Sequence, residues 1–418
     1  MKVLIVGSGG REHAIAWKTA QSRRVDKIYC APGNAGISQV AECVDIKPME
    51  FEKLVAFAKE KEIDLTVIGM DDPLVGGIVD AFQEAGLRVF GPNKAAAILE
   101  GSKAFSKNLM KKYGIPTAAY ETFTDPEAAL AYLETAKMPI VLKADGLALG
   151  KGVLICQDLS EARAGVRELM MDKKFGSAGN EIVVEEFMTG REVSVLSFVD
   201  GNPVKIMSSA QDHKRAKDGD QGLNTGGMGN YSPSPFYTKE VDAYCQEHIY
   251  QPTVDAMKAE GRPFKGVIFF GLMLTENGPK VLEYNARFGD PEAQVVLPRL
   301  ENDIVDVFEA CIDGTLDQID LKFDNDRATV CVILASDGYP VSYEKGFVID
   351  GLEKFRDKED YYVFHSGTKF NGQGQIVTNG GRGLGVTANG ATVKEARENA
   401  YKAVEAISFA NKYYKTAI

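Results

Sequence analysis

Cysteine and histidine are scarce in this sequence, and their spacing fits neither a zinc site nor a disulfide framework. The six cysteines and four histidines are scattered, and no two cysteines form a Cys-x-x-Cys pair. We therefore expect no zinc, and free thiols in a reducing cytoplasm. The first apolar run, residues 3–6, is too short for a signal-peptide core or a membrane span, so we interpret it as a β-strand.

Positive charge is also in short supply. The 48 lysines and arginines are outnumbered by 59 acidic residues, giving a formal net charge of -11. This balance argues against a nucleic-acid partner or an anionic membrane surface, both of which require a basic face. A local basic pocket around a phosphate is still compatible with this negative net charge. At 418 residues the chain exceeds what one hydrophobic core serves, so we expect roughly two to four domains.

The first hundred residues alternate strand and helix signals. Strands are predicted at residues 3–6, 27–30, 65–68 and 88–90, and helices at residues 12–21, 51–61 and 73–85. This order predicts an α/β domain with a parallel sheet and right-handed crossovers. Gly91-Pro92 interrupts the pattern and marks a boundary.

The remainder of the chain predicts mixed α+β structure. Asp125 caps a helix that opens with Pro126. Two apolar runs, at residues 267–274 and 281–285, flank an Asn-Gly turn and predict an antiparallel hairpin. Residues 211–229 are interpreted as a long polar, glycine-rich loop. A final domain is predicted from a strand at residues 328–335 and a helix opened by the capping box of Thr392 and Glu395.

A glycine-rich turn, Gly-Ser-Gly-Gly-Arg-Glu-His at residues 7–13, follows the first predicted strand. Small residues before a helix allow backbone N–H groups to approach an anion. A dinucleotide fingerprint is disfavoured, because Glu12 occupies the position of its third glycine and no acid is placed for the ribose. The positive charge of Arg11 suits a phosphomonoester ligand instead. The alternative is that the motif is a tight turn with a purely structural role. Asn34 and Asp71 follow two other strands and could bind sugar hydroxyls or an amine, or form ordinary turns.

Lys143 ends a predicted strand and precedes a glycine-rich loop at residues 146–152. The spacing is not that of a P-loop, but a lysine beside a mobile glycine segment is another way to hold a polyphosphate. Glu283 and Asn285 share one face of a predicted strand, with Arg287 next along it. Their oxygens suit Mg²⁺ carried on nucleotide phosphates, and the guanidinium suits a carboxylate or a developing negative charge. His213 lacks a serine or cysteine partner, so we do not expect a general base there.

Together these motifs resemble the phosphoribosylamine–glycine ligase (glycinamide ribonucleotide synthetase) family of the ATP-grasp superfamily. The similar stretches extend over nearly the whole chain, at residues 7–13, 32–36, 99–103, 143–152, 211–215, 224–229 and 285–292. The last of them, Asn-x-Arg-Phe-Gly-Asp-Pro-Glu followed by Gln294, is similar to the family's own signature. Two departures are Met70-Asp71, where many members have Pro-Glu, and Leu223, where proline is common.

The resemblance implies a domain order and a set of site residues. An N-terminal parallel-sheet (pre-ATP-grasp) domain would occupy residues 1–101. A two-subdomain ATP-grasp module would occupy residues 102–325, with its lid at about 119–190, and a C-terminal α+β domain residues 326–418. ATP would be bound by Lys103, Lys143, Gly150, Lys151, Glu185, Glu186 and Glu192, and the metal by Glu283 and Asn285. Phosphoribosylamine would be bound by Gly9, Gly10, Arg11, Glu12, Asn34 and Asp71, and Asp212, Lys214 and Arg287 would lie at the reacting glycine.

The implied reaction joins glycine to 5-phosphoribosylamine through glycyl phosphate, with ATP as the phosphoryl donor and Mg²⁺ or Mn²⁺ as the metal. Such chemistry depends on positioning and charge neutralisation and needs no protein nucleophile. We expect the loop at residues 146–152 to close over the site, and the protein to be a monomer or weak dimer. The alternatives are another ATP-grasp carboxylate–amine ligase or carboxylase, a dinucleotide-dependent oxidoreductase, and a nucleotide sensor without turnover.

Overall fold

The N-terminal residues form a parallel sheet, as their alternating pattern predicts, and it has five strands because β3 joins the four predicted ones. The strand order is β3-β2-β1-β4-β5, with β1 (Lys2–Gly7), β2 (Lys27–Pro32), β3 (Glu42–Cys43), β4 (Leu65–Ile68) and β5 (Val89–Phe90). Val3 and Ile5 pack into one hydrophobic cluster while Leu4 and Val6 pack into another. Both faces of β1 are therefore buried, which is typical of a parallel strand covered by helices on both sides.

The helices of this N-terminal part differ in two places from the sequence prediction. They are α1 (Gly10–Thr19), α2 (Phe51–Glu60), α3 (Asp71–Gly76), α4 (Ile78–Glu84) and α5 (Lys94–Gly101), with a 3-10 turn η1 (Ile37–Gln39). The single helix predicted at residues 73–85 is wrong, because Gly77 has φ +99 and separates α3 from α4. The first helix also begins earlier than predicted, at Gly10.

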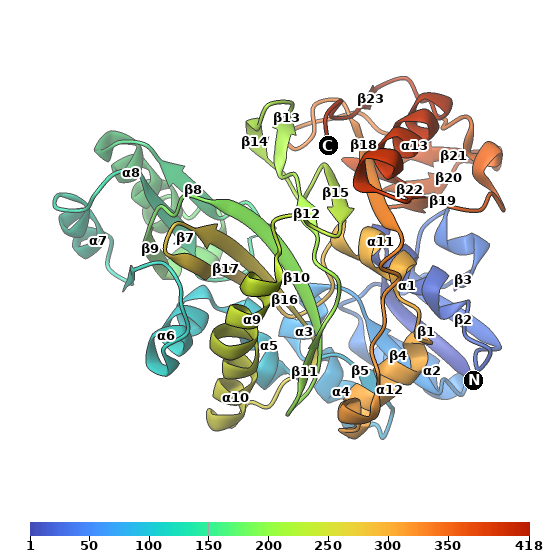
Figure 1. Ribbon diagram of the computed structural model, residues 1–418, viewed down its shortest axis with the longest axis horizontal. Helices are drawn as coiled ribbons and strands as arrows, with labels where there is room; N and C mark the ends of the chain where they lie inside the picture. The colour runs from blue at the N-terminus through green and yellow to red at the C-terminus, as the bar shows by residue number, and fades with distance from the viewer. Residues whose placement is uncertain (149) are drawn as a thin grey trace.

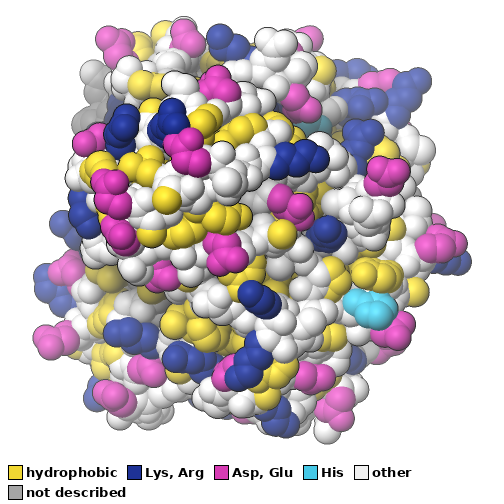
Figure 2. All heavy atoms as spheres, turned by 90° about the vertical axis from the view of Figure 1, so that its left-hand side faces the viewer, with side chains coloured by type: hydrophobic (Ala, Val, Ile, Leu, Met, Phe, Trp, Pro, Cys, Tyr) yellow, Lys and Arg dark blue, Asp and Glu magenta, His cyan; other side chains and the backbone are white. Residues whose placement is uncertain are grey.

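An outer four-stranded antiparallel sheet lies at the left of Figure 1. Its order is β6-β9-β7-β8, with β6 (Tyr120–Phe123), β7 (Ile140–Ala144), β8 (Val153–Cys156) and β9 (Ile182–Glu186). It is preceded by α6 (Lys103–Tyr113) and accompanied by α7 (Pro126–Leu133), α8 (Leu159–Val166), η2 (Arg167–Met171) and η3 (Gly176–Asn180). The predicted cap is confirmed, since Asp125 accepts a hydrogen bond from the backbone N–H of Glu127. On this face Lys and Arg side chains are interspersed with Asp and Glu (Figure 2).

The central sheet carries the predicted hairpin. Its order is β11-β10-β16-β17, with β10 (Arg191–Asp200), β11 (Val204–Ile206), β16 (Lys265–Thr275) and β17 (Gly278–Asn285). The antiparallel pairing of β16 and β17 confirms the hairpin, and the ladder is irregular between Gly271 and Leu272, opposite Glu283. Beside the sheet run α9 (Lys239–Cys245), η4 (Gln246–Tyr250) and α10 (Gln251–Ala259).

The C-terminal sheet recruits strands from the region predicted to be one long loop. Its path is β12-β15-β18-β22-β19, with β23 also paired to β18. The strands are β12 (Gln211–Asp212), β15 (Gly229–Ser232), β18 (Ala328–Ser336), β19 (Tyr361–His365), β22 (Arg382–Gly390) and β23 (Lys412–Tyr413). The loop prediction for residues 211–229 is therefore wrong, because they supply β12, the start of β15 and a small hairpin of β13 (Arg215–Lys217) and β14 (Gln221–Asn224). Among these strands only β15 has a distant partner, β18, while β12 pairs with β15 and β13 pairs with β14.

The remaining elements link the sheets. They are α11 (Glu292–Val296), η5 (Leu297–Arg299), α12 (Ile304–Asp313), η6 (Leu316–Gln318), η7 (Leu352–Phe355), the ribbon of β20 (Thr368–Phe370) and β21 (Ile376–Thr378), and α13 (Val393–Ala406). The capping box predicted for α13 is confirmed in its first bond, because Thr392 accepts from the backbone N–H of Glu395. The structure describes residues 1–148 and 150–418, so Leu149 in the predicted closing loop lies outside the described residues. No helix in the part of the chain that the structure describes has the length and apolar character to cross a membrane.

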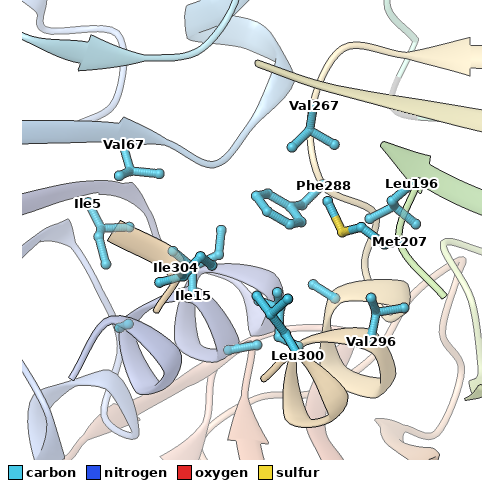
Figure 3. Packing of buried hydrophobic residues seen from close by; sticks show 14 of the residues in the cluster. Ile5, Ile15, Val67, Leu196, Met207, Val267, Phe288, Val296, Leu300 and Ile304 are labelled. Atoms are coloured by element: carbon cyan, nitrogen blue, oxygen red, sulfur yellow. The ribbon is translucent and has the colours of Figure 1, made fainter. Parts of the chain in front are cut away.

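One hydrophobic cluster connects the N-terminal, central and C-terminal parts. It includes Ile5 and Val67 from the N-terminal sheet, Leu196 and Val267 from the central sheet, and Phe288 between the central sheet and α11 (Figure 3). Ile333 and Phe364 of the C-terminal sheet belong to the same cluster. Because close-packed cores resist deformation, this shared core holds the loops of the three parts in a defined relationship.

Candidate active site

The larger of two neighbouring cavities, with a volume of about 700 Å³, lies between the N-terminal and C-terminal sheets. Its N-terminal wall comes from the loops after β1, β2 and β4, where the carboxyl ends of parallel strands meet. Its opposite wall comes from the β19–β20 turn, the β21–β22 turn and the segment after β17. Of the predicted substrate residues, the lining includes Gly9, Arg11, Glu12 and Asn34.

The glycine-rich turn encloses the carboxylate of Glu12. A Cβ on Gly7 would collide with the Glu12 Oε1 atom, and the φ of +139 at Gly7 also favours glycine. Glu12 is 1% exposed, and Arg11 Nε lies 3.2 Å from its Oε2. Burial raises the pKa of Glu12, although the charge of Arg11 opposes this effect. The turn therefore holds Arg11 against a buried carboxyl group, with its guanidinium at the cavity wall.

The side chain of Asn34 is engaged in structural hydrogen bonds. Its amide donates to the carbonyl oxygens of Ser8 and His365, both over 2.8 Å, and its Oδ1 accepts from the backbone N–H of Ile37 over 2.9 Å. Asn34 thus ties the loop after β2 to the loop after β1 and to the C-terminal sheet. It lines the cavity, and it also fixes the shape of the cavity.

The C-terminal half of this cavity was not anticipated from sequence. Asp290 accepts from the backbone N–H of Arg11 over 3.2 Å and from Gln294 Nε2 over 2.7 Å. Arg382 Nη1 donates to the Asp290 carbonyl oxygen over 2.9 Å. Burial would raise the pKa of Asp290, but Arg382 and Arg11 together hold it below its usual range. Asp290 lies within the 285–292 motif that resembles the family, whereas no sequence motif pointed to Arg382.

The smaller cavity, of about 130 Å³, collects most of the residues predicted to bind the nucleotide and metal. Its lining includes Asp71, Lys103, Lys143, Gly150, Glu283, Asn285 and Arg287. Lys103 begins α6 directly after Ser102, whose hydroxyl accepts from the backbone N–H of Phe105. Burial lowers the pKa of Lys103. Asp71, predicted to face the phosphosugar, lines this cavity, whereas its neighbour Met70 lines the larger one.

Lys143 is held by a buried carboxylate. Its Nζ lies 2.6 Å from Glu185 Oε1 and donates to the Leu282 carbonyl oxygen over 3.2 Å. The second Glu185 oxygen lies 2.8 Å from Nζ of Lys107. Lys107 was not predicted from the sequence, although it follows Lys103 by about one helical turn and so lies on the same face of the helix. Glu185 therefore serves as the shared partner of two lysines that line the cavity.

The predicted metal ligands fit an oxygen-binding cation. Glu283 and Asn285 lie two residues apart on β17 and both line the smaller cavity. Lys214 Nζ lies 3.2 Å from Glu283 Oε1 and 3.9 Å from Glu192 Oε2. The charge of Lys214 lowers the pKa of Glu283 to about 2, so its carboxylate is ionised at neutral pH. Within the described residues no three His, Cys, Asp or Glu side chains form a self-contained metal site, so phosphate oxygens would have to complete the coordination.

Arg287 lies at the wall of the smaller cavity. Its Nη2 lies 3.2 Å from Glu100 Oε2, and its Nη1 donates to the Phe288 carbonyl oxygen over 3.3 Å. Glu100 also accepts from the backbone N–H of Ala286 over 2.8 Å. Burial raises the pKa of Glu100, while Arg287 opposes this. Glu100 lies in the 99–103 stretch that resembles the family, but the sequence alone did not indicate a role for it.

Other predicted residues lie around these cavities. Asp212 accepts from the backbone N–H of His213 over 2.8 Å, and burial together with Glu292 raises its pKa well above the usual range. Gly10 packs under the larger cavity, where an added Cβ would meet Gln294 and Ser366. Glu186 accepts from the backbone N–H of Ala119 over 3.1 Å and is half exposed. Among the described residues, the two linings do not include Gly10, Lys151, Glu185, Glu186, Glu192, Asp212 or Lys214.

Comparison with known proteins agrees with this architecture. Models of phosphoribosylglycinamide synthetase match the N domain at residues 1–100, the ATP-grasp (A) domain at residues 101–293 and the C domain at residues 329–418. A phosphoribosylamine–glycine ligase of Caldanaerobacter subterraneus subsp. tengcongensis is 51% identical over 419 residues, covering 100% of this chain and 99% of the relative. One of Vibrio parahaemolyticus serotype O3:K6 is 50% identical over 421 residues, covering 100% and 97%.

Solved structures show the same relationship. The phosphoribosylamine–glycine ligase of Thermotoga maritima superimposes with a TM-score of 0.85 at 34% identity, covering 99% of each chain. The biotin carboxylase domain of the Hydrogenobacter thermophilus 2-oxoglutarate carboxylase has a TM-score of 0.74 at 19% identity, over 99% of this chain and 91% of that one, which shows a shared fold alone.

The fold, together with a cavity lined by lysines and by the side-chain oxygens of Glu283 and Asn285, defines an ATP-grasp enzyme. Such an enzyme uses ATP with a divalent metal. More particularly, the chain belongs to the phosphoribosylglycinamide synthetase family. The family and the fold class predicted from the motifs are thereby confirmed. Membership also excludes the dinucleotide-dependent oxidoreductase that was considered as an alternative.

Proposed function

We propose that this chain joins glycine to 5-phosphoribosylamine, producing glycinamide ribonucleotide, ADP and phosphate. The observation that carries the proposal is that Arg11, at the wall of one cavity, and Arg287, at the wall of a chemically different one, both donate to the Phe288 carbonyl oxygen. One cavity has the lysines and oxygen ligands suited to a nucleotide polyphosphate, and the other has a glycine-rich turn with Arg11 suited to a phosphosugar. A reaction that couples ATP cleavage to capture by a sugar amine requires such adjacency.

The first step forms glycyl phosphate. A glycine carboxylate oxygen attacks the γ-phosphorus of ATP, the bond to the β-phosphate oxygen breaks, and ADP leaves. Lys103 and Lys143 neutralise the phosphate charge, and Arg287 orients the carboxylate. Glu283 and Asn285 would hold Mg²⁺ or Mn²⁺, which neutralises charge on the phosphoryl oxygens when bound. The remaining ATP contacts are assigned to Gly150, Lys151, Glu185, Glu186 and Glu192.

The second step forms the amide. The amine of phosphoribosylamine attacks the acyl carbon, the C–N bond forms, and the C–O bond to phosphate breaks with release of inorganic phosphate, while the amine nitrogen gives up one proton to the departing phosphate or to solvent. Gly9, Gly10, Arg11, Glu12, Asn34 and Asp71 are assigned to the phosphosugar. Asp212 and Lys214 are assigned to glycine. Oriented reactants can contribute roughly 7–11 kcal/mol to lowering the barrier.

We also propose domain bounds at residues 1–101, 102–325 and 326–418, with an outer subdomain at about 119–190. The N-domain model ends at residue 100 and the C-domain model begins at residue 329, which supports boundaries near residues 101 and 326, while the ATP-grasp model itself ends at residue 293. We propose a cytoplasmic monomer or weak dimer, and the six free cysteines fit a reducing compartment. Light scattering coupled to size exclusion tests the oligomeric state, and a stable larger assembly contradicts it.

Release of ADP by the purified protein tests the function. Glycine and freshly generated phosphoribosylamine are added with ATP and Mg²⁺, separately and together. We expect full turnover only with both, and mass spectrometry should identify glycinamide ribonucleotide. Turnover that requires a different acid–amine pair would overturn the substrate assignment. Binding of ATP without turnover in any combination would instead favour a nucleotide sensor.

A further inference from the structure

A buried group of three charged side chains links α6 to the outer sheet. Nζ of Lys107 lies 2.8 Å from Glu185 Oε2, and Nζ of Lys143 lies 2.6 Å from Glu185 Oε1. The side chains of Lys107, Glu185 and Lys143 are 4%, 1% and 8% exposed. Burying three charges is costly unless each is paired, so such a group is a specific feature of the fold.

The group lies where the outer sheet meets the central sheet. Lys143 on β7 and Glu185 on β9 belong to neighbouring antiparallel strands, since Val141 pairs with Glu185. Lys107 on α6 donates to the Thr117 hydroxyl over 2.7 Å, and that hydroxyl donates to the Val281 carbonyl oxygen over 2.7 Å. Lys107 is thus linked by hydrogen bonds to the central sheet through Thr117, whereas Glu185 is itself part of the outer sheet.

The charges of the group do not balance. One carboxylate faces two ammonium groups, so the group by itself carries one net positive charge at the wall of the smaller cavity, which Lys103 and the Glu283 carboxylate also line. If Lys143 were the sole partner of Glu185, the positive charge of Lys143 would be fully neutralised. The attraction of Lys143 for an anion would then be reduced. Burial raises the pKa of Glu185, but the two lysines hold it below the usual range, so the carboxylate is ionised.

We propose that Lys107 is a positioning residue for nucleotide binding. By sharing Glu185 with Lys143, it keeps the Lys143 ammonium fixed and only partly neutralised, so that Lys143 attracts the polyphosphate. Lys107 acts through Glu185 and Lys143, and the inference rests on the proposed assignment of Lys143 to the ATP phosphates.

Binding of tripolyphosphate and of adenosine, measured by calorimetry, separates this role from a general loss of structure. Tripolyphosphate probes the phosphate subsite alone, and adenosine probes the remainder of the nucleotide site. Lys107→Met removes the charge with little change in volume. We expect it to weaken tripolyphosphate binding at least tenfold and adenosine binding less than threefold, while the KM for ATP rises. Lys111→Met is the matched control on an exposed position of the same helix, and both affinities should be unchanged.

Two further variants address folding and charge. Lys107→Arg keeps the positive charge and should restore tripolyphosphate binding to within threefold of wild type. Thr117→Val keeps every charge but removes the hydroxyl that holds Lys107, so tripolyphosphate binding should weaken at least twofold. The midpoint of urea unfolding is followed for all variants. Equal losses for tripolyphosphate and adenosine, together with a lower unfolding midpoint, would overturn the proposal in favour of a structural role.

Lys143→Met distinguishes failure of this inference from failure of the proposed function. If Lys143→Met abolishes tripolyphosphate binding while Lys107→Met leaves it unchanged, the role of Lys107 is refuted and the phosphate assignment stands. If both variants bind tripolyphosphate as wild type does, the assignment of Lys143 to the phosphates is itself refuted.

Discussion

Arg11 and Arg287 donate to the same acceptor, the carbonyl oxygen of Phe288, over 3.2 and 3.3 Å. Arg11 lines the larger cavity and Arg287 the smaller one, so the walls of the two cavities share this hydrogen-bond acceptor. The Phe288 ring is buried in the core shared by three parts of the molecule (Figure 3). The relative position of the two arginines is therefore set by packing.

Glu283→Ala should abolish turnover and leave the fold intact. The carboxylate is one of two proposed metal ligands from the protein, and its removal leaves only Asn285 on β17. ADP release with all substrates should fall at least a hundredfold, as expected for the loss of about 3 kcal/mol of charge stabilisation at a phosphoryl site. The urea unfolding midpoint should stay near that of wild type. Near-normal ADP release at low millimolar Mg²⁺ would contradict the metal assignment.

Arg287→Met should destabilise the protein, because it leaves Glu100 buried without its ionic partner. Breaking such a pair costs about 3–5 kcal/mol of the free energy of unfolding. Adding Glu100→Gln should recover part of this loss, because the amide is neutral and its oxygen still accepts from the Ala286 N–H. Urea unfolding of the single and double variants measures the effect. A double variant no more stable than Arg287→Met would show that the Glu100 charge is not the cause.

Gly10→Ala should disrupt the contact between the first turn and the C-terminal sheet. A methyl group there would collide with Gln294 Nε2 and would lie 2.8 Å from Ser366 Oγ. Gly9→Ala is the matched control, since its methyl group would meet Glu12 Oε2 only at 3.2 Å. We expect Gly10→Ala to lower the free energy of unfolding by about 1–3 kcal/mol, which is more than Gly9→Ala should, and urea unfolding measures both. Equal effects of the two changes would argue against this contact.

His365 should make the protein less stable as the pH falls from about 6.5 to about 4. Burial lowers the pKa of His365 to about 4. Above pH 6.5 the imidazole is neutral in both states, whereas below it only the unfolded chain binds the proton, so acid favours unfolding until about pH 4. The full effect is about 3 kcal/mol for such a shift. Burial also lowers the pKa of His13, whose Nδ1 accepts from the His365 backbone N–H, and this adds in the same direction.

Urea unfolding between pH 7 and pH 4.5 checks this dependence. His365→Gln should have a shallower decline than wild type, because it lacks the titrating imidazole. The control is His248→Gln, at a half-exposed position outside the core, which should keep the wild-type slope. Parallel slopes for His365→Gln and wild type would refute the assignment.

Local features of the fold were predictable, because their causes are local. The buried parallel strand β1 and the β16–β17 hairpin follow from apolar runs and turn residues a few positions apart. The cap at Asp125 follows from the same kind of signal. The break of the predicted helix at Gly77 was missed, since a glycine within a helical pattern does not reveal whether its φ is positive. The strand β15 was missed because its ladder depends on β18, about a hundred residues further along the chain, and β12 was missed with it because β12 pairs with β15.

The sequence by itself determined the family and the candidate groups for its chemistry. Lys143 before its glycine-rich loop, the Glu283 and Asn285 pair, and the glycine turn with Arg11 stand out by residue type and spacing, and the family resemblance adds Lys103. Only the tertiary structure decided which of these groups meet. Lys107 with Glu185, and Arg382 with Asp290, are brought together across long stretches of chain. Such contacts follow from how separate elements pack on a shared core, and no local pattern of residues encodes that packing.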